Sequence, residues 1–342
     1  MSTRAQAETF ALALSGGGAR GFAHIGILKA LEEEKLEPDL IVGCSMGAVV
    51  GGLFAAGYSA EQIRHMALTT DWSDLFLDRP SRRNLFLAQK ETTSRHILAL
   101  RFRGFAPDVP LALSNGQKLS DLLFDLAQRA PYHPWPSFDD LRIPFRAVAT
   151  DLISGKPKIF SEGDLAEALR GSISLPLVFS PYRMDTLSLV DGGVFENIPV
   201  EIARNQGSDF VVAVNVSSDF IPGRPVEAPW ELADRVTTLM QVDRNRQSRA
   251  LADMVVTPEI GDHGSADFSD IDSLIQIGYE SMKASIPELR ARLAPRPHPN
   301  RSASFFWTVS QNRSSWLSCC RYSRARRYTP SECSNREWCA AG

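Results

Sequence analysis

Short apolar runs in the first part of the chain are each followed by a glycine-rich turn and then by a helical pattern. The run 9–14 leads into the glycine-rich segment 15–21, and the run 40–42 leads into a second such segment, 43–47. Apolar side chains then recur at helical spacing after each segment. Uninterrupted apolar runs are typical of strands that are buried on both faces. Two strand–helix units in succession therefore predict an α/β protein with a parallel sheet covered on both faces.

The same alternation continues along the rest of the chain. Further strands are predicted at 145–150, 187–190, 210–216 and 254–257. Helical patterns lie at about 116–130, 165–170, 229–251 and 271–293. Asp164 is the expected N-cap of the helix at 165–170. One domain is therefore expected at 9–294, after a short N-terminal extension at 1–8.

Residues 295–342 differ in composition and in hydrophobic pattern from the domain before them. They lack a helical or strand period and contain four of the five Cys, with eight Arg against two Glu. We expect a poorly ordered basic tail, in which no pair of Cys or His at metal-ligand spacing is followed by a second pair. Because the net charge of the whole chain is −3, the domain itself carries about −9. This charge argues against nucleic-acid binding by the domain.

The segment 72–105 interleaves aromatic and basic side chains. Loops and short helices over the carboxyl end of the sheet are expected here. Either the aromatic side chains pack an insertion, or the segment is a lid or an interfacial surface that meets an anionic membrane. No apolar run reaches the length of a membrane span, and the first residues do not resemble a secretory signal. The expectation is a cytoplasmic protein with at most peripheral membrane contact.

Ser45 lies between the second predicted strand and the helix after it, within Gly43-Cys44-Ser45-Met46-Gly47. Gly-x-Ser-x-Gly at a strand-to-helix turn is typical of a nucleophile elbow, which presents the serine hydroxyl at the carboxyl end of the strand. Glycines at positions 43 and 47 let the backbone turn sharply there. Taken alone, the pattern also fits a serine that only caps the helix.

The first glycine-rich segment allows two interpretations. Gly16, Gly18 and Gly21 match the dinucleotide-binding pattern G-x-G-x-x-G between a strand and a helix. That site, however, needs an acidic residue at the end of the second strand, where this chain has Ser45. Alternatively, the glycines expose backbone N–H groups that form an oxyanion hole, where one donor typically contributes about 3 kcal/mol of transition-state stabilisation.

A serine nucleophile needs a base, and Asp191 is the strongest candidate. It follows the apolar run 187–190 and precedes two glycines, so it stands on a tight turn at the end of a strand, at the same sheet edge as Ser45. A carboxylate buried there could accept the proton of the hydroxyl directly.

A histidine base is the alternative. The order Ser45, Asp191, His263 fits the triad of α/β-hydrolases, but that fold places several strands before its nucleophile. His263 is expected in a surface loop, and His24 and His65 lie within helical patterns, where packing or solvent exposure is the simpler role.

Three ordered motifs, at 16–21, 43–47 and 191–193, together resemble those of the patatin-like phospholipase family. The chain also resembles bacterial members of this family at 150–152 and 172–179, and at Asn197-Ile198-Pro199. The resemblance covers about 9–293. It implies a three-layer α/β/α fold with a mainly parallel central sheet, and a serine acyl hydrolase of the lipase or phospholipase type that cleaves acyl ester bonds of lipids.

The resemblance also assigns roles to single residues. It implies a Ser–Asp dyad rather than a triad, with Ser45 as nucleophile and Asp191 as general base. It implies that the oxyanion hole is the loop of Gly16, Gly17, Gly18, Ala19, Arg20 and Gly21, in which Arg20 supports the loop. Neither a metal nor another cofactor is implied. The lipid class, the acyl-chain and positional preference, and the oligomeric state stay open.

Two other function classes are compatible with these residues. One is a catalytically silent regulatory protein that senses lipids or acyl ligands on the same fold, although no element of the dyad or the loop is missing. The other is a nicotinamide- or flavin-binding protein, which would carry a bound nucleotide. Turnover of p-nitrophenyl acyl esters would distinguish an enzyme from a sensor.

Overall fold

The sheet is organised around β1 (Phe10–Leu14), which lies between β9 (Phe210–Val214) and β2 (Leu40–Cys44). The computed structural model describes residues 9–77, 101–103, 106–108, 112–134, 136–217 and 229–293. β10 (Met254–Val256) extends the sheet beyond β9, β5 (Phe145–Asp151) extends it beyond β2, and all of these strands run parallel. The predicted parallel core is confirmed.

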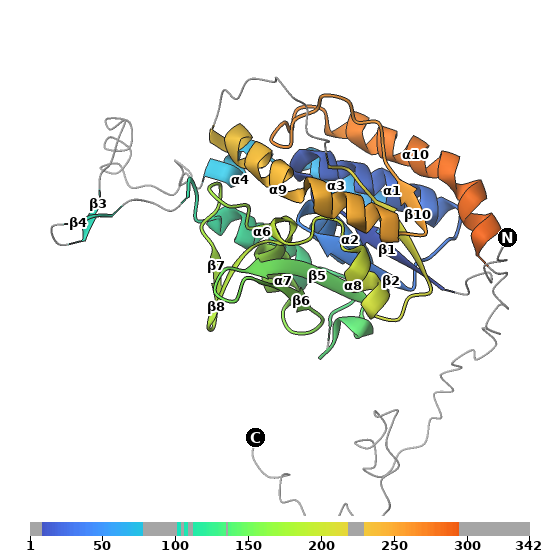
Figure 1. Cartoon of the computed structure of the whole chain (residues 1–342), viewed down its shortest axis with the longest axis horizontal. Helices are drawn as coiled ribbons and strands as arrows, with labels where there is room; N and C mark the ends of the chain where they lie inside the picture. Colours follow the sequence, from blue (N-terminus) through green and yellow to red (C-terminus); the bar gives the residue numbers. More distant parts are fainter. Residues whose placement is uncertain are drawn as a thin grey trace, which may run out of the picture. The chain divides into compact units, whose positions relative to one another are not determined.

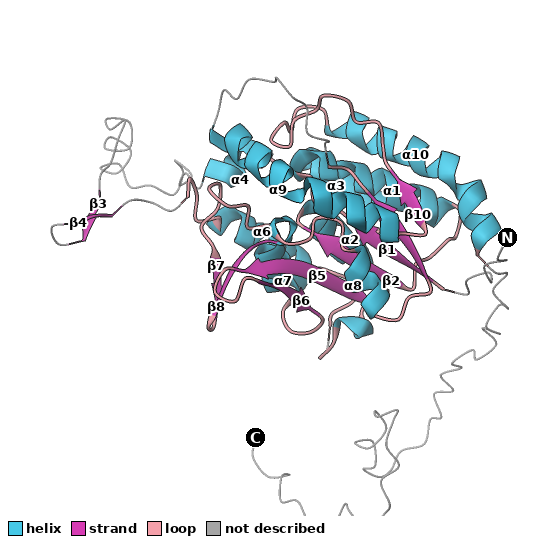
Figure 2. Ribbon diagram, in the orientation of Figure 1, coloured by secondary structure: helices cyan, strands magenta, loops and turns pink. Residues whose placement is uncertain are grey.

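Antiparallel strands complete the sheet next to β5. β6 (Lys156–Phe160) and β8 (Leu187–Asp191) both pair with β5, and β7 (Tyr182–Met184) pairs with β8. The sequence predicts β8 but neither β6 nor β7, because β6 is polar at its start and β7 has only three residues. The sheet is therefore mainly parallel with an antiparallel edge (Figure 2).

β1 shows how the two faces of the sheet divide the core. Phe10, Leu12 and Leu14 belong to a large apolar cluster, whereas Ala11 and Ala13 belong to a smaller one. This alternation follows from the two-residue period of a strand. The helices of the large cluster are α1 (Ala23–Glu33), α2 (Met46–Ala55), α3 (Ala60–Thr69), α6 (Gln117–Gln128), α7 (Leu165–Ser172) and α10 (Ile271–Arg292). α8 (Val200–Asn205) covers the other face, so the fold is three-layer α/β/α, as expected (Figure 1).

Several helix boundaries follow the sequence signals closely. α9 spans Pro229–Leu251 and α10 begins at Ile271, as predicted. Asp164 caps α7, since its side chain accepts a hydrogen bond of 3.0 Å from the Glu167 N–H. The pattern does not predict the short 3₁₀ helices η1 (Gly18–Phe22), η3 (Phe138–Asp140) and η4 (Gly192–Val194).

The aromatic and basic segment 72–105 lies only partly within the described residues. It contributes the short helix α4 (Trp72–Leu77), which was expected, and β3 (Arg101–Arg103), which pairs with β4 (Ala106–Asp108) and was not. Residues 78–100, the extension 1–8 and the tail 295–342 fall outside the described ranges. Of the helices that the structure describes, none is both long and apolar enough to cross a membrane.

Candidate active site

Two strands end against neighbouring residues of β5. β2 pairs with β5 up to Cys44, opposite Val148, and β8 pairs with it up to Asp191, opposite Ala149. Because β6 occupies the other edge of β5, β2 and β8 lie along the same edge and run toward each other. Their carboxyl ends therefore meet. The sequence placed Asp191 at this sheet edge, but it did not reveal that the strand carrying it is antiparallel.

Ser45 adopts a backbone conformation that is rare for a residue with a side chain. Its φ is 54° and its ψ is −126°, and α2 begins at the next residue. The turn is closely packed, because a Cβ atom at Gly47 would lie 2.5 Å from the carbonyl oxygen of Ser15, and one at Gly43 would lie 2.5 Å from the Cα of Ala48. A strained residue at a strand-to-helix turn has the geometry of a nucleophile elbow.

The carboxyl group of Asp191 lies beside Ser45 and is 4% exposed. Burial raises the pKa of this carboxyl from 3.8 to about 6, and hydrogen bonds from the Ser45 side chain, the Gly193 N–H and Cys44 limit the rise. The Gly193 nitrogen is 2.8 Å from Oδ1, and the Cys44 Sγ is 3.9 Å from the same oxygen. Such a carboxylate is ionised at neutral pH and is more basic than an ordinary aspartate.

The glycine-rich loop makes a close approach to a segment far along the chain. Gly18 has a φ of 58°, and a Cβ atom there would lie 2.2 Å from the carbonyl oxygen of Ser265. Glycine is therefore required at this position on two counts. The same carbonyl accepts a hydrogen bond of 2.7 Å from the Ala19 N–H. Residues 261–270, which follow β10, thus hold the loop in place.

The N–H groups of the loop are not all equally available. The Gly16 N–H donates to the carbonyl of Asn197 at 3.2 Å, and the Ala19 N–H is already paired. Within the residues that the structure describes, the N–H groups of Gly17 and Gly18 have no hydrogen-bond partner. These two amides are the ones that could face a developing oxyanion.

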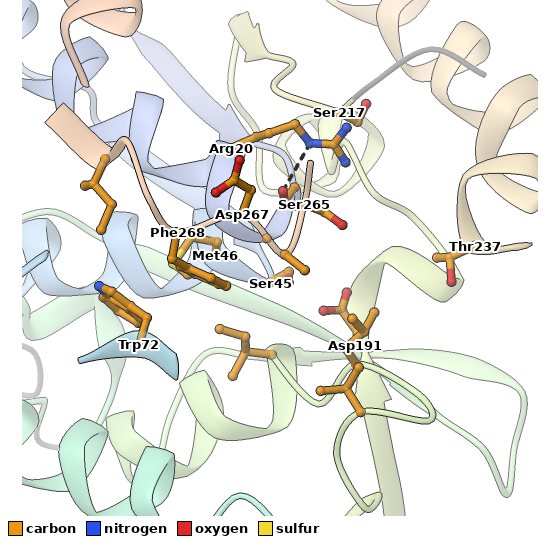
Figure 3. Close-up of a pocket in the computed structure, with 18 of the residues that line it drawn as sticks. Arg20, Ser45, Met46, Trp72, Asp191, Ser217, Thr237, Ser265, Asp267 and Phe268 are labelled. Atoms are coloured by element: carbon orange, nitrogen blue, oxygen red, sulfur yellow. Dashed lines mark hydrogen bonds between the residues drawn. The ribbon is translucent and has the colours of Figure 1, made fainter. Parts of the chain in front are cut away.

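Arg20 and Gly21 attach the loop to its surroundings. The Arg20 side chain is largely buried, and its Nε donates a hydrogen bond of 3.3 Å to the carbonyl of Gly17 (Figure 3). Gly21 lies against the first residue of α2, because a Cβ atom there would be 2.5 Å from the Cβ of Met46. Arg20 therefore stabilises the backbone of the glycine-rich loop through a hydrogen bond within the same segment.

A single cavity of about 990 Å³ contains Ser45, Asp191 and the loop. Part of its wall is apolar and is formed by Met46, Leu68, Trp72, Leu113, Ile173, Leu175, Val178, Phe179 and Phe268. The other lining residues include many polar and acidic ones: Arg20, Thr70, Asp71, Asn197, Ser217, Thr237, Thr238, Gln241, Ser265, Asp267, Ser269, Asp270 and Asp272. In Figure 3, Trp72 and Phe268 lie on one side of Ser45, and Thr237 lies on the other. The cavity suits a molecule with one apolar and one polar part.

None of the described residues that line this cavity is a histidine. The Nε2 of His263 lies 2.6 Å from the carbonyl oxygen of Asp267, and its Nδ1 is 3.8 Å from the Asp267 carboxylate. His24 is buried, with its Nε2 2.8 Å from the Ser15 carbonyl, and burial lowers its pKa from 6.5 to about 4. His65 is exposed. Among the residues that the structure describes, no histidine lines the cavity beside Ser45.

Sequence reasoning missed polar residues around Asp191. Gln241 in α9 is 8% exposed, and its Nε2 donates a hydrogen bond of 2.5 Å to the carbonyl of Gly193. Glu196 is also buried, which raises its pKa from 4.5 to about 7. The motif Asn197-Ile198-Pro199 alone does not indicate a role for Asn197. In the structure, its carbonyl accepts a hydrogen bond from the Gly16 N–H of the glycine loop. Nothing in the sequence distinguishes Gln241 from the other polar residues of its predicted helix.

The described residues also offer no evident metal centre. No group of three or more His, Cys, Asp or Glu side chains in these ranges is arranged to hold a metal ion.

Several known proteins are similar in sequence to this chain. An uncharacterized NTE family protein of Mycobacterium tuberculosis is 35% identical over 219 residues, which are 64% of this chain and 52% of that protein. The chain thus spans about half the length of that relative. Human patatin-like phospholipase domain-containing protein 6 is 27% identical over 304 residues, 81% of this chain and 20% of that protein. Lysophospholipase NTE1 of Pyricularia oryzae is 24% identical over 315 residues, 85% of this chain and 19% of that protein.

Solved structures give more distant similarities. VipD from Legionella pneumophila has a TM-score of 0.44 at 14% sequence identity, over 83% of this chain and 67% of that one. ExoU of Pseudomonas aeruginosa, in its complex with SpcU, has a TM-score of 0.44 at 18% identity, over 85% of this chain and 52% of that one. The family model for patatin-like phospholipases matches residues 12–204, more than half of the chain. The chain belongs to the patatin-like phospholipase family.

Proposed function

We propose that this protein is a serine acyl hydrolase that cleaves acyl ester bonds of lipids, with Ser45 as nucleophile and Asp191 as general base. The observation that carries the proposal is the pairing of a strained serine with a buried carboxyl of raised pKa in one cavity. A base with a pKa near the working pH transfers protons efficiently in both directions. The family membership and the lysophospholipase name of one relative support a lipid ester as substrate.

The first half of the reaction forms an acyl-enzyme. Asp191 takes the proton of the Ser45 hydroxyl as its Oγ attacks the ester carbonyl carbon. The carbonyl oxygen gains the negative charge, and the N–H groups of Gly17 and Gly18 stabilise it. Asp191 then gives its proton to the alcohol oxygen as the carbon–oxygen bond breaks, so the alcohol leaves neutral.

The second half releases the acid. Asp191 removes a proton from a water molecule that attacks the carbonyl of the acyl-enzyme, and the same amides stabilise the second tetrahedral intermediate. Its collapse breaks the bond to Ser45 Oγ, which regains a proton from Asp191. The acyl group leaves as a carboxylic acid. The protons balance with Ser45, Asp191 and water alone.

The cavity wall supports a division of the substrate between its two parts. An acyl chain fits the apolar side chains of Trp72, Phe268 and Ile173, whereas the alcohol part fits the opposite side of Ser45, where Thr237 lies. A lipid that reaches this cavity must leave a bilayer or micelle first. Peripheral contact with a membrane is therefore part of the proposal.

The experiment is turnover of p-nitrophenyl butyrate together with labelling by a fluorophosphonate. The wild-type protein should do both, Ser45→Ala should lose both, and His263→Ala should keep both, since His263 is bonded to Asp267 instead. Labelling that persists in Ser45→Ala would overturn the nucleophile, and a loss in His263→Ala would restore the triad. A wild-type protein that binds lipid without turnover would favour a sensing role.

A further inference from the structure

The backbone amide of Ser45 is held by a side chain from a different part of the chain. The Ser45 N–H donates a hydrogen bond of 2.9 Å to the Oγ of Ser172, the last residue of α7. The same hydroxyl donates a hydrogen bond of 2.6 Å to the carbonyl of Val148. Val148 is the residue of β5 that pairs with Cys44 at the end of β2. Ser172 thus ties the elbow to the strand on which β2 and β8 meet.

We propose that Ser172 is a positioning residue for the nucleophile: its hydroxyl fixes the Ser45 backbone in the strained conformation that directs the Ser45 Oγ at Asp191. This inference rests on the proposed function. A residue at positive φ keeps that conformation only where its surroundings enforce it. The Ser172 bond acts on the peptide group that leads into Ser45, directly at the strained φ angle.

The chemistry of the contact requires a hydroxyl. One oxygen must accept from the Ser45 N–H and donate to the Val148 carbonyl at the same time, and a serine hydroxyl offers one donor and two acceptor sites. Ser172 is fully buried, so water cannot replace it. Alanine would leave both backbone groups without this partner.

The same turn also contacts the base. Two residues after Ser172, the carbonyl of Ser174 accepts a hydrogen bond of 2.9 Å from the Asp191 N–H. Ile173, between them, lines the cavity. The end of α7 is therefore bonded to the backbones of Ser45 and Asp191 at once. The Ser172 hydroxyl supplies the attachment to Ser45, and the Ser174 backbone supplies the one to Asp191, so this turn relates the positions of the two residues.

The test compares Ser172→Ala and Ser172→Cys with a matched control, Ser114→Ala. Ser114 is also a buried serine, 4% exposed, and its Oγ accepts a hydrogen bond of 2.9 Å from the Gly116 N–H. For each protein we would measure the melting temperature, kcat and KM for p-nitrophenyl butyrate, and the rate constant of fluorophosphonate labelling.

Ser172→Ala should lower kcat and the labelling rate by about 100-fold, the loss expected for a misplaced reacting group, with KM changed less than about twofold. Ser172→Cys, which keeps the shape and a weak hydrogen-bonding group, should recover part of the rate. Ser114→Ala should lose stability but keep kcat within about twofold of wild type. The midpoint of the pH profile should not move in Ser172→Cys, because the hydroxyl does not contact the Asp191 carboxylate.

The inference is overturned if folded Ser172→Ala keeps kcat and labelling within about twofold of wild type, or loses rate only in proportion to Ser114→Ala. If Ser172→Ala does not fold, the cysteine variant decides: full wild-type kcat and labelling in Ser172→Cys would overturn the proposal. A wild-type protein that neither hydrolyses esters nor is labelled would instead overturn the proposed function itself.

Discussion

Burial determines which of two neighbouring side chains can act as a nucleophile. Cys44 directly precedes Ser45, and a thiolate is intrinsically the more reactive group. Burial, together with the charges of Asp191 and Glu196, raises the pKa of the Cys44 thiol well above its ordinary value of 9.0. The thiol therefore stays protonated beside Asp191. The hydroxyl of Ser45, for which Asp191 is the proposed base, is the group expected to react.

The raised pKa of Asp191 predicts the acid side of the pH profile. A general base must be ionised, so kcat/KM should rise about tenfold per pH unit in acid and level off above about pH 6. An ordinary aspartate would already be ionised near pH 4. The measurement is kcat/KM for p-nitrophenyl butyrate across this range, with the protein shown to remain folded. A rate that is flat between about pH 5 and 7 would contradict the assignment of the base.

The same carboxyl makes a prediction about stability. Between the ordinary pKa of 3.8 and the folded value of about 6, the folded state binds a proton that the unfolded state has lost. Protonation therefore favours the fold, and this contribution, at most about 3 kcal/mol, is lost as the pH rises through about 6. Asp191→Asn should be inactive but should melt higher than wild type at about pH 8, with a smaller difference at about pH 4.

Thermal unfolding of both proteins at the two pH values checks this second prediction. Glu196→Gln is a useful comparison, because burial raises the pKa of Glu196 to about 7, and its removal should also stabilise the protein at alkaline pH while leaving Ser45 with its base. If Asp191→Asn melts lower than wild type at alkaline pH, the hydrogen bonds of the carboxylate stabilise the fold. The interpretation that burial of the charged carboxylate destabilises the fold would then be wrong.

At the scale of single residues, the sequence revealed what depends on local chain geometry. A glycine-flanked serine between a strand and a helix predicts a tight turn, and Ser45 has the positive φ of such a turn. Contacts across the fold are different. Ser172 lies 127 positions after Ser45, and Gln241 lies 48 after Gly193, so neither partner could be found without knowing how the strands pair. The catalytic roles themselves stay predictions.

At the scale of elements, buried strands could be predicted but their direction could not. An apolar run such as 187–190 looks the same in a parallel and in an antiparallel strand. β8 lies between β5 and β7 and pairs antiparallel with both of them, because β7 and β8 form a hairpin. This reversal is what places the end of β8 against the end of β2, and no motif in the sequence records it.

The apolar wall of the cavity predicts a chain-length preference. The rings of Trp72 in α4 and Phe268 in the loop before α10 stack with centroids 5.7 Å apart and planes 12° apart. Trp72 is fixed by a hydrogen bond of 2.8 Å from its Nε1 to the Ala67 carbonyl. A long acyl chain that reaches this pair would lose contact area in Trp72→Ala, and each methylene in an apolar pocket contributes about 1–3 kcal/mol to discrimination.

We therefore expect Trp72→Ala to lower kcat/KM for p-nitrophenyl decanoate by about tenfold or more, and for the butyrate ester by less than about threefold. Phe124→Ala is the control, because Phe124 is 55% exposed on α6 and does not line the cavity. Phe124→Ala should have the same kcat/KM as wild type for both esters. Equal losses on the two esters in Trp72→Ala would mean that the tryptophan supports the fold and does not bind the chain.

At the scale of the whole molecule, the last described helix is locked onto the first. A Cβ atom at Gly26 of α1 would lie 1.9 Å from the carbonyl oxygen of Ile275, and one at Gly278 of α10 would lie 2.0 Å from the carbonyl oxygen of Ala23. The two helix backbones are therefore in direct contact. Met282, Ile286 and Leu289 on α10 are buried in the large cluster. These contacts of α10, all between described residues, close the core on this side.

Charged groups attach the carboxyl-terminal half of α10 to the end of α1. Lys283 and Arg290 each reach the Glu34 carboxylate at 2.9 Å, and Arg290 also donates a hydrogen bond of 2.8 Å to the carbonyl of the same residue. These groups are partly exposed, so each pair contributes little alone. Together with the buried apolar side chains, they anchor α10 to α1 through contacts between described residues.

Truncation after residue 294 should therefore leave the domain intact. The melting temperature should change by less than about 3 °C, which corresponds to about 2 kcal/mol in a domain of this size. Activity toward p-nitrophenyl butyrate should stay within about twofold of the full chain, since residues 295–342 hold none of the groups proposed to react. Removal of four of the five Cys should also reduce oxidative aggregation.

The informative control is a full-length protein with Cys319, Cys320, Cys333 and Cys339 replaced by serine. If aggregation falls equally in this variant and in the truncated protein, the thiols alone explain it. A truncated protein that is insoluble, or that loses the soluble ester as a substrate while the serine variant keeps it, would show that 295–342 stabilises the body. The boundary at residue 294 would then be wrong, because α10 would need a partner beyond the contacts with α1.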